Sequence, residues 1–401
     1  MKINLFIQCC FFMTMLFSFS ACMKDDFVES KSQATIALDK SNLPTTFTVS
    51  NLKLTLKESN SGSVYTVPVD ISKESASTEV NFGTYAASLE GDILVSENGK
   101  EKKMRITARK EAIVVNANTV SIDLKLFLSD PSANFVFKEI FYTGNRTPEN
   151  KAYHGDKYFI LQNNSNDTLY ADGLLIAQSY YLTTTMRVYT PAIMDEAFTT
   201  QQIIMIPGDG DDYPVYPGED FIIANNAINH LQNNTNSLDL TQADVEIELL
   251  SNINVDNPAV PNTISVAGNL LMHDRGFTGY VLARLPQGLT VETYKKDYAY
   301  TLSYIATNGR EISVEAYKIP NSNIIDAVNL SVSEGYEWLV TSAALDMGWT
   351  YCGTTNSDQN RYGKSVIRKS LGKTIDGKDL LKDTNNSAED FQAESSPSLK
   401  K

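Results

Sequence analysis

Histidine, cysteine and serine side chains carry most nucleophilic and metal-binding chemistry, and this sequence combines them in few recognisable patterns. Its three histidines, His154, His230 and His273, are separated by 76 and 43 positions, with no His-x-x-x-His or Glu-x-x-His pair among them. Asp274 follows His273, but no serine lies in a Gly-x-Ser-x-Gly turn that could complete a triad. The sequence therefore predicts a protein without catalytic activity and without a transition-metal site.

A short run of acidic residues is the one candidate for a cation site. Asp209, Asp211 and Asp212 follow Pro207 and Gly208, and closely spaced carboxylates on a flexible turn can converge on Ca²⁺. The run lacks the terminal bidentate glutamate of a complete calcium loop. A solvated hairpin turn is therefore the favoured interpretation; the cofactor prediction is none, with Ca²⁺ kept as the alternative.

Aromatic residues are more plentiful, with 20 Tyr, 17 Phe and 2 Trp. Most tyrosines of a β-rich protein are ordinary strand residues. Tyr213 and Tyr216 lie in a turn that also contains Pro214 and Pro217, and Trp349 follows a glycine, so these three fit strands least. They are the predicted ligand-binding or partner-binding residues, because exposed rings can stack on sugars, ring systems or aromatic peptides.

The first 21 residues read as a signal peptide, with Lys2 ahead of an apolar run that ends at Phe19-Ser20-Ala21-Cys22. The segment resembles a bacterial lipoprotein signal, which implies that Cys22 is lipidated and becomes the first mature residue. An ordinary secretory signal with an incidental cysteine is the alternative. Loss of residues 1–21 leaves Cys352 as the one unmodified cysteine, predicted to be buried and structural.

Residues 22–34 are polar and without periodicity, and are predicted to form a tether. Lys24, Asp25 and Asp26 resemble the export signal that sends Bacteroidetes lipoproteins to the cell surface, which implies an outer-membrane anchor facing outward. A solvated charged tether is the alternative. The net charge of -14 repels nucleic acid and anionic lipid, so membrane attachment is expected through the lipid alone.

The remainder is predicted to be all-β. From residue 35 to 130, short segments alternate apolar and polar residues at about ten-residue spacing, which is typical of an Ig-like sandwich. Leu52 to Leu89 resembles a carboxypeptidase-regulatory-like module, a type that mostly spaces or presents other domains. Pro131 and Ser132 mark the boundary to a second strand series over residues 131–401, interrupted by an insertion at about 232–287.

Several short motifs in the second series, spread over residues 135–391, resemble a lamin-tail-like Ig fold. They are Lys138-Glu139-Ile140, Asp172-Gly173-Leu174, Pro217-Gly218-Glu219, Ser365 to Arg368 and Lys382 to Phe391. Phe141 to Asn150 resembles the hallmark loop of an uncharacterised Bacteroidetes outer-membrane lipoprotein family built on this domain. Members of that family often accompany TonB-dependent receptors.

The leading functional prediction is a surface lipoprotein that binds a nutrient for, or forms part of, a TonB-dependent uptake system. Expected partners are the receptor and a small nutrient, glycan or peptide ligand. A structural or adhesive surface protein is the alternative. An extracellular hydrolase is a third reading, because lamin-tail-like domains occur beside such enzymes; fold alone does not choose among them.

Overall fold

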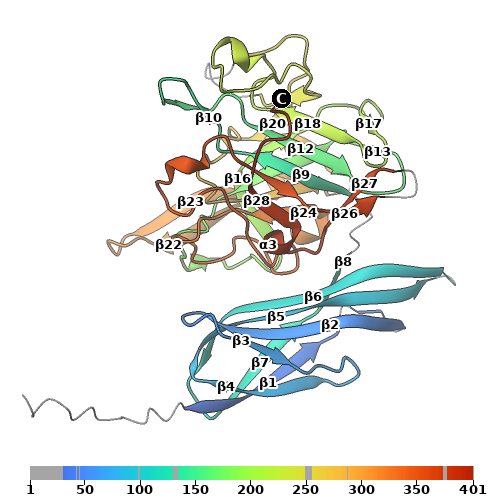
Figure 1. Cartoon of the computed structure of the whole chain (residues 1–401), viewed down its shortest axis with the longest axis vertical. Helices are drawn as coiled ribbons and strands as arrows, with labels where there is room; N and C mark the ends of the chain where they lie inside the picture. The colour runs from blue at the N-terminus through green and yellow to red at the C-terminus, as the bar shows by residue number, and fades with distance from the viewer. Residues whose placement is uncertain are drawn as a thin grey trace, which may run out of the picture.

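The computed structural model describes residues 30–400, except 42, 45, 98–99, 130–133, 249–254, 287 and 374–376. The predicted signal peptide, Cys22, Lys24, Asp25 and Asp26 lie outside the described residues. The described chain is almost entirely β-structure and forms two groups of sheets, one before and one after residues 130–133 (Figure 1). This confirms the predicted all-β class and its β-sandwiches. No helix in the described ranges is long and apolar enough to cross a membrane.

The N-terminal sandwich packs a three-stranded sheet against a five-stranded one. The smaller sheet has the order β4 (Ser75–Asn81), β1 (Lys31–Asp39), β7 (Thr119–Lys125). The larger has the order β3 (Val64–Val67), β2 (Phe47–Glu58), β5 (Gly83–Glu97), β6 (Lys100–Val115), β8 (Phe127–Ser129). β1 pairs antiparallel with β4 and parallel with β7.

The tether was predicted to extend to residue 34, but strand β1 already begins at Lys31. Ser32 and Ala34 are buried on the same face as Ile36 and Leu38, so the strand begins at Lys31. Ser32 and Ala34 are small and weakly apolar, so the alternation of buried and exposed positions in this strand is not visible in the sequence. The first strand therefore starts four residues before the predicted boundary.

The C-terminal sandwich consists of two larger sheets. One has the order β19 (Val245–Glu246), β18 (Asp220–Ala224), β12 (Tyr158–Asn163), β9 (Phe135–Phe141), β25 (Ser365–Arg368), β28 (Phe391–Ser395). The other has the order β15 (Tyr189–Thr190), β22 (Ala299–Ile305), β23 (Glu311–Pro320), β16 (Ala197–Met205), β14 (Leu174–Ser179), β21 (Gly279–Arg284), β24 (Ile324–Asn329), and β20 (Ile264–Ala267) pairs with β16.

Short elements decorate these sheets. Three two-stranded ribbons pair β10 (Asn145–Arg146) with β11 (Ala152–Tyr153), β13 (Leu169–Tyr170) with β17 (Pro214–Val215), and β26 (Ser370–Lys373) with β27 (Asp379–Leu381). The helical elements are α2 (Val291–Asp297), α3 (Ser387–Asp390), and the 3₁₀ turns η1 (His230–Gln232), η2 (Asn321–Asn323) and η3 (Gln359–Arg361). Thr290 begins α2 with a reciprocal capping box to Thr293.

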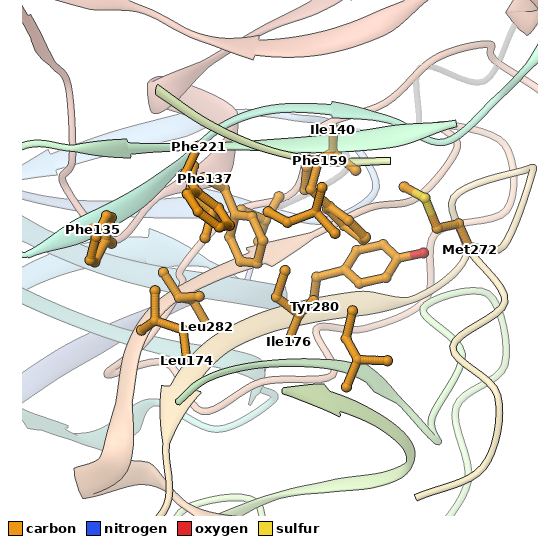
Figure 2. Packing of buried hydrophobic residues seen from close by; sticks show 14 of the residues in the cluster. Phe135, Phe137, Ile140, Phe159, Leu174, Ile176, Phe221, Met272, Tyr280 and Leu282 are labelled. Atoms are coloured by element: carbon orange, nitrogen blue, oxygen red, sulfur yellow. The ribbon is translucent and has the colours of Figure 1, made fainter. Parts of the chain in front are cut away.

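The main core lies between the two C-terminal sheets, where rings from one layer meet aliphatic side chains from the other (Figure 2). Phe159 of β12 packs edge-on against Tyr280 of β21, with ring centroids 5.2 Å apart. The central strands are buried on both faces: Ile176 points into this core, whereas its neighbours Leu175 and Ala177 belong to a second cluster near α2. These strands therefore appear in the sequence as continuous apolar runs rather than alternating ones.

The predicted insertion at 232–287 needs correction at its C-terminal end. β21 lies between β14 and β24 in the middle of its sheet, so it is part of the framework. An earlier part of the segment does cover a face of the other sheet, where Leu238, Leu240 and Val260 pack against Tyr158 and Ile160. Polar loop residues on either side of β21 hid its place in the sheet.

Candidate functional site

A cleft lies at the β15 edge of the C-terminal sandwich. It has a volume of about 560 Å³ and is formed by the segment before β15, the end of β22 and the turn that follows it. Its lining residues are Thr185, Met186, Arg187, Val188, Thr190, Ser303, Tyr304, Ile305, Thr307 and Glu311. We call this cleft the edge groove.

Three aliphatic side chains of the edge groove are open to solvent. Val188 is 85% exposed, Ile305 63% and Met186 57%. Single exposed apolar residues are ordinary on protein surfaces, but three that line one concave site form a patch of the kind that contacts partners.

A stack of aromatic rings supports the edge groove from below. Tyr189 lies 4.2 Å from Tyr181 and 5.4 Å from Tyr304, measured between ring centroids, and is stacked on Trp338 at 6.1 Å with an interplanar angle of 17°. The Arg187 guanidinium lies over the Tyr304 ring at 4.5 Å. Burial raises the pKa of Tyr189 to about 12, so its hydroxyl stays neutral at physiological pH. Tyr304 brings this ring cluster to the groove, whose charged lining residues are Arg187 and Glu311.

Hydrogen bonds between side chains and the backbone hold the segment that carries Met186 and Val188. The Trp338 indole N–H donates to the Leu182 carbonyl at 2.8 Å, and the Met186 backbone N–H donates to a Glu337 carboxylate oxygen at 2.5 Å. The exposed side chains are therefore presented by a fixed backbone, which reduces the entropy lost on binding.

The predicted binding residues lie elsewhere, and none of them lines the edge groove. Tyr213 packs edge-on against Phe221 at 5.8 Å and adjoins the main core, while Tyr216 is 53% exposed. Trp349 is half-buried and stacked on Tyr336, with centroids 5.1 Å apart at 19°. Of the three, Tyr216 alone is more than half exposed.

The predicted calcium ligands do not converge. Asp209, Asp211 and Asp212 are exposed, and the described residues contain no group of three or more His, Cys, Asp or Glu side chains that could hold a metal. An Asp212 carboxylate oxygen instead accepts the Asp209 backbone N–H at 2.9 Å. The acidic run forms a hydrogen-bonded turn on the surface.

Asp172, which the sequence did not single out for this role, organises that turn. Its carboxylate accepts the backbone N–H groups of Gly210 at 3.1 Å, Asp212 at 3.0 Å and Tyr213 at 2.9 Å. Burial raises the pKa of Asp172, but these three donors outweigh burial and lower it overall.

The three histidines, far apart in the sequence, lie in one polar region of the C-terminal sandwich. His230 is fully buried, with Nδ1 2.7 Å from the Tyr153 hydroxyl and Nε2 2.9 Å from the Asn226 carbonyl. His154 and His273 interact electrostatically with Asp274. Desolvation lowers the pKa of all three imidazoles, which keeps them neutral at pH 7. Sequence spacing gave no sign of this grouping.

Two carboxylates and two cations complete this region. Asp156 is fully buried and accepts from Asn145 Nδ2 at 2.7 Å, and Asp274 pairs with Arg361 at 2.8 Å. Burial raises the pKa of Asp156. Lys157, the second cation, is buried with 6% of its surface exposed and donates from Nζ to the Met272 carbonyl at 2.8 Å.

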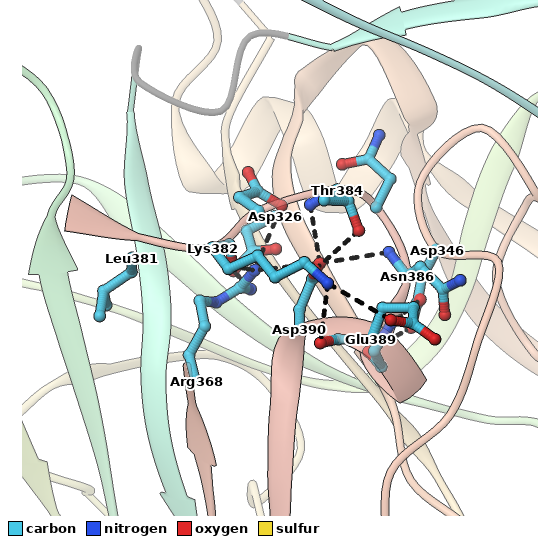
Figure 3. A network of polar contacts seen from close by, with 12 residues as sticks. Asp326, Asp346, Arg368, Leu381, Lys382, Thr384, Asn386, Glu389 and Asp390 are labelled. Carbon is cyan, nitrogen blue, oxygen red and sulfur yellow. Dashed lines mark hydrogen bonds and ion pairs between the residues drawn. The ribbon is translucent and has the colours of Figure 1, made fainter. Parts of the chain in front are cut away.

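The motifs at 365–368 and 382–391 that resemble the lamin-tail-like family form a buried ionic network (Figure 3). Arg368 lies 2.5 Å from Asp326, 3.2 Å from Asp383 and 3.6 Å from Asp390. Thr384 donates its hydroxyl to Asp390 at 2.7 Å. Burial raises the pKa of Asp383 to about 6. These residues tie the closing segment to β9 and β24, so their role is structural.

Cys352 is buried and free, as predicted. Burial raises the pKa of its thiol to about 12, which removes the thiolate needed for reactivity.

Part of the chain is similar to a known protein family. Residues 216–398 match the model of DUF4876, a family of proteins of unknown function. A crystal structure of a DUF4876 family protein from Bacteroides thetaiotaomicron is 23% identical, covers 92% of this chain and 97% of its own, and has a TM-score of 0.57. The two proteins share a fold. Both findings fit the predicted resemblance to a Bacteroidetes family of unknown function.

Two further structures, provisionally described as cell adhesion proteins, come from Parabacteroides distasonis and Bacteroides eggerthii. They are 11% and 10% identical, cover 73% and 74% of this chain and 85% and 81% of their own, and have TM-scores of 0.17. Similarity at that level carries no inference. No curated protein matches the sequence.

Proposed function

We propose that this protein is a non-enzymatic binding protein whose edge groove holds an apolar segment of a protein partner. The observation that carries the proposal is the group of Met186, Val188 and Ile305, which are exposed in one groove beside the Tyr304 ring. Rigid aromatic residues and arginines are enriched among the residues that dominate binding energy at interfaces, and Tyr304 and Arg187 supply both here.

The position of the groove suits an extended peptide segment. β15 is a two-residue strand at the end of its sheet order, so its outer edge has no neighbouring strand among the described residues. An added strand can pair with such an edge through its backbone while its side chains contact the apolar patch. A peptide segment of the partner therefore fits better than a small polar nutrient.

For the cellular setting, we propose the predicted one: an outer-membrane lipoprotein anchored at Cys22, facing outward, that accompanies a TonB-dependent receptor. The support is the resemblance of the N-terminal sequence to a lipoprotein signal, followed by Lys24-Asp25-Asp26. The receptor is then the partner that supplies the apolar segment.

The groove is tested with a double variant, Val188→Ser with Ile305→Ser, which removes apolar area without disturbing buried contacts. Val64→Ser is the matched control, because Val64 is 59% exposed but lies in the N-terminal sandwich. Each variant is expressed in the native host, crosslinked, and purified from solubilised outer membrane. We expect the double variant to lose the crosslinked receptor while the control keeps it. Equal recovery from both would exclude the groove.

Anchorage and exposure are tested separately from the groove. Cys22→Ser should release the protein from the membrane fraction or leave its signal uncleaved. Replacing Lys24, Asp25 and Asp26 by Ala should protect the protein from protease added to intact cells. Protection of the unmodified protein in the same assay would place it on the inner leaflet instead.

A further inference from the structure

A second cavity opens in the polar region that contains the three histidines. It has a volume of about 170 Å³, which corresponds to about five or six water molecules at ~30 Å³ each. Its lining residues are His154, Gly155, Lys157, Asn225, Asn226, Leu271 and Met272. We call it the lysine pocket.

Sheet pairing brings the first two walls together. β12 and β18 are antiparallel, with Tyr158 opposite Ala224, so the residues just before β12 face those just after β18. Leu271 and Met272, from the segment between β20 and β21, form the third wall, and Met272 lies at the rim of the main core (Figure 2). The pocket is thus built by three segments far apart in the sequence.

Lys157 is a buried cation whose charge no neighbouring carboxylate offsets at close range. Its Nζ makes one hydrogen bond, to a backbone carbonyl, and no described carboxylate lies within ion-pair distance of it. Of the acids around it, Asp274 pairs with Arg361, and Asp156 accepts from Asn145 and Ser237 through Oδ2 alone. A buried charge of this kind costs free energy unless an opposite charge pairs with it.

The side chains of Asn225 and Asn226 bring hydrogen-bond donors to the lysine pocket. Asn225 and Asn226 each donate one amide N–H to the Gly155 carbonyl, at 3.4 Å and 3.1 Å, which leaves each a second N–H. The His154 imidazole is exposed at the pocket mouth and makes no hydrogen bond to the described residues. Donors around one ammonium match the acceptor-only chemistry of a carboxylate.

We propose that the lysine pocket binds the carboxylate of a small organic acid, with Lys157 as its counter-charge and the amides of Asn225 and Asn226 as additional donors. A single close cation favours a singly charged carboxylate over doubly charged phosphate. Leu271 and Met272 provide an apolar wall for a short carbon chain. This ligand site is independent of the edge groove and of the partner proposed there.

The test is isothermal titration with sodium propionate at pH 7 and constant ionic strength, with sodium phosphate and sodium chloride titrated in parallel. We expect propionate to bind to one site and more tightly than phosphate, with chloride giving no saturable heat. Lys157→Met should weaken propionate binding at least tenfold. Lys151→Met, an exposed lysine six residues away, should leave it unchanged.

Asn225→Leu provides a second variant that keeps the lysine. It removes one donor, and we expect a several-fold weaker affinity with an unaltered far-ultraviolet spectrum. Absence of saturable propionate binding, equal binding by Lys157→Met, or tighter binding of phosphate would each overturn the proposal.

The pH dependence gives a further readout. Burial lowers the pKa of Lys157 to about 8, and the charged or titratable groups around it are His154, Asp156, His273, Asp274 and Arg361. Because the neutral amine no longer offers a counter-charge, propionate binding should be lost between pH 7 and pH 9.5. Unchanged affinity at pH 9.5 would contradict the assigned role of Lys157.

Discussion

The two sandwiches of this protein bury different kinds of residue. The N-terminal core is one apolar cluster in which inward residues such as Ile36, Leu54 and Leu89 alternate with outward polar ones. The C-terminal sandwich buries its central strands on both faces and encloses ionic groups, among them Arg368, Asp326 and Asp156. Both candidate binding sites lie in the C-terminal sandwich.

The two sandwiches are therefore specified in different ways, one by its apolar pattern and the other also by buried ion pairs. A sandwich held by alternating apolar residues needs little beyond its pattern, and it can serve as a spacer. The stability of a sandwich that buries charged side chains depends on specific ion pairs, because each buried ion needs a counter-ion nearby. The same dependence creates pockets in which a ligand can supply a missing partner.

The largest expected effect comes from breaking the C-terminal ionic network. Arg368→Met leaves Asp326 and Asp383 without a cation, while Asp390 keeps Lys382 at 3.9 Å. Removal of one partner from such a buried group typically costs about 3–5 kcal/mol. The free energy of unfolding from denaturant titration at pH 7 measures the loss. A change below about 1 kcal/mol would show that the network contributes no more than a surface pair.

Lys157→Met should act in the opposite direction and depend on pH. The pKa of Lys157 is lowered from 10.5 to about 8, so the unfolded chain binds more protons between those values and wild-type stability rises with pH across them. Below pH 8 the buried ammonium destabilises the fold by about 3 kcal/mol, at ~1.4 kcal/mol per pH unit. The variant should therefore be more stable than wild type at pH 7.

Comparing the pH profiles of the two proteins isolates this effect. Their difference in unfolding free energy should shrink between pH 8 and 10.5, since wild type regains stability there. A constant difference would show that Lys157 titrates at its ordinary pKa in the folded protein.

Tyr213 and Tyr216 should respond unequally to replacement by alanine. Tyr213 packs against Phe221 and the core, so Tyr213→Ala should cost about 1–3 kcal/mol, below the usual range for a fully buried aromatic. Tyr216→Ala should change stability by less than about 0.5 kcal/mol. Thermal melts of both variants check this. If Tyr216→Ala alone weakens partner recovery, this turn is a contact in addition to the edge groove.

A small effect is expected for the ion pairs of the N-terminal sandwich. Arg105 pairs with Asp92 at 3.0 Å and with Glu90 at 3.5 Å, and all three side chains remain partly open to water. Arg105→Met should therefore cost about 0–1 kcal/mol. A loss as large as that of Arg368→Met would break the comparison between the two sandwiches.

Sequence reasoning succeeded where a local pattern carries the information. Alternation of period two predicted the N-terminal sandwich, and the lack of any partner cysteine pointed to a buried thiol at Cys352. It assigned the apolar run of β21 to an insertion, because the order of residues does not show that this strand lies between β14 and β24. The proline-rich turn also gave no sign that Tyr213, one of the predicted binding residues, packs against Phe221.

By itself, the sequence determined the all-β class, the two sandwiches and the buried Cys352, since each follows from residue type and spacing within a short window. Only the tertiary structure decided where ligands could bind. The lysine pocket joins residues near 155, 225 and 271, and the edge groove joins residues near 187 and 305. Antiparallel pairing between distant strands sets these neighbours, and no local pattern encodes which strand ends will meet.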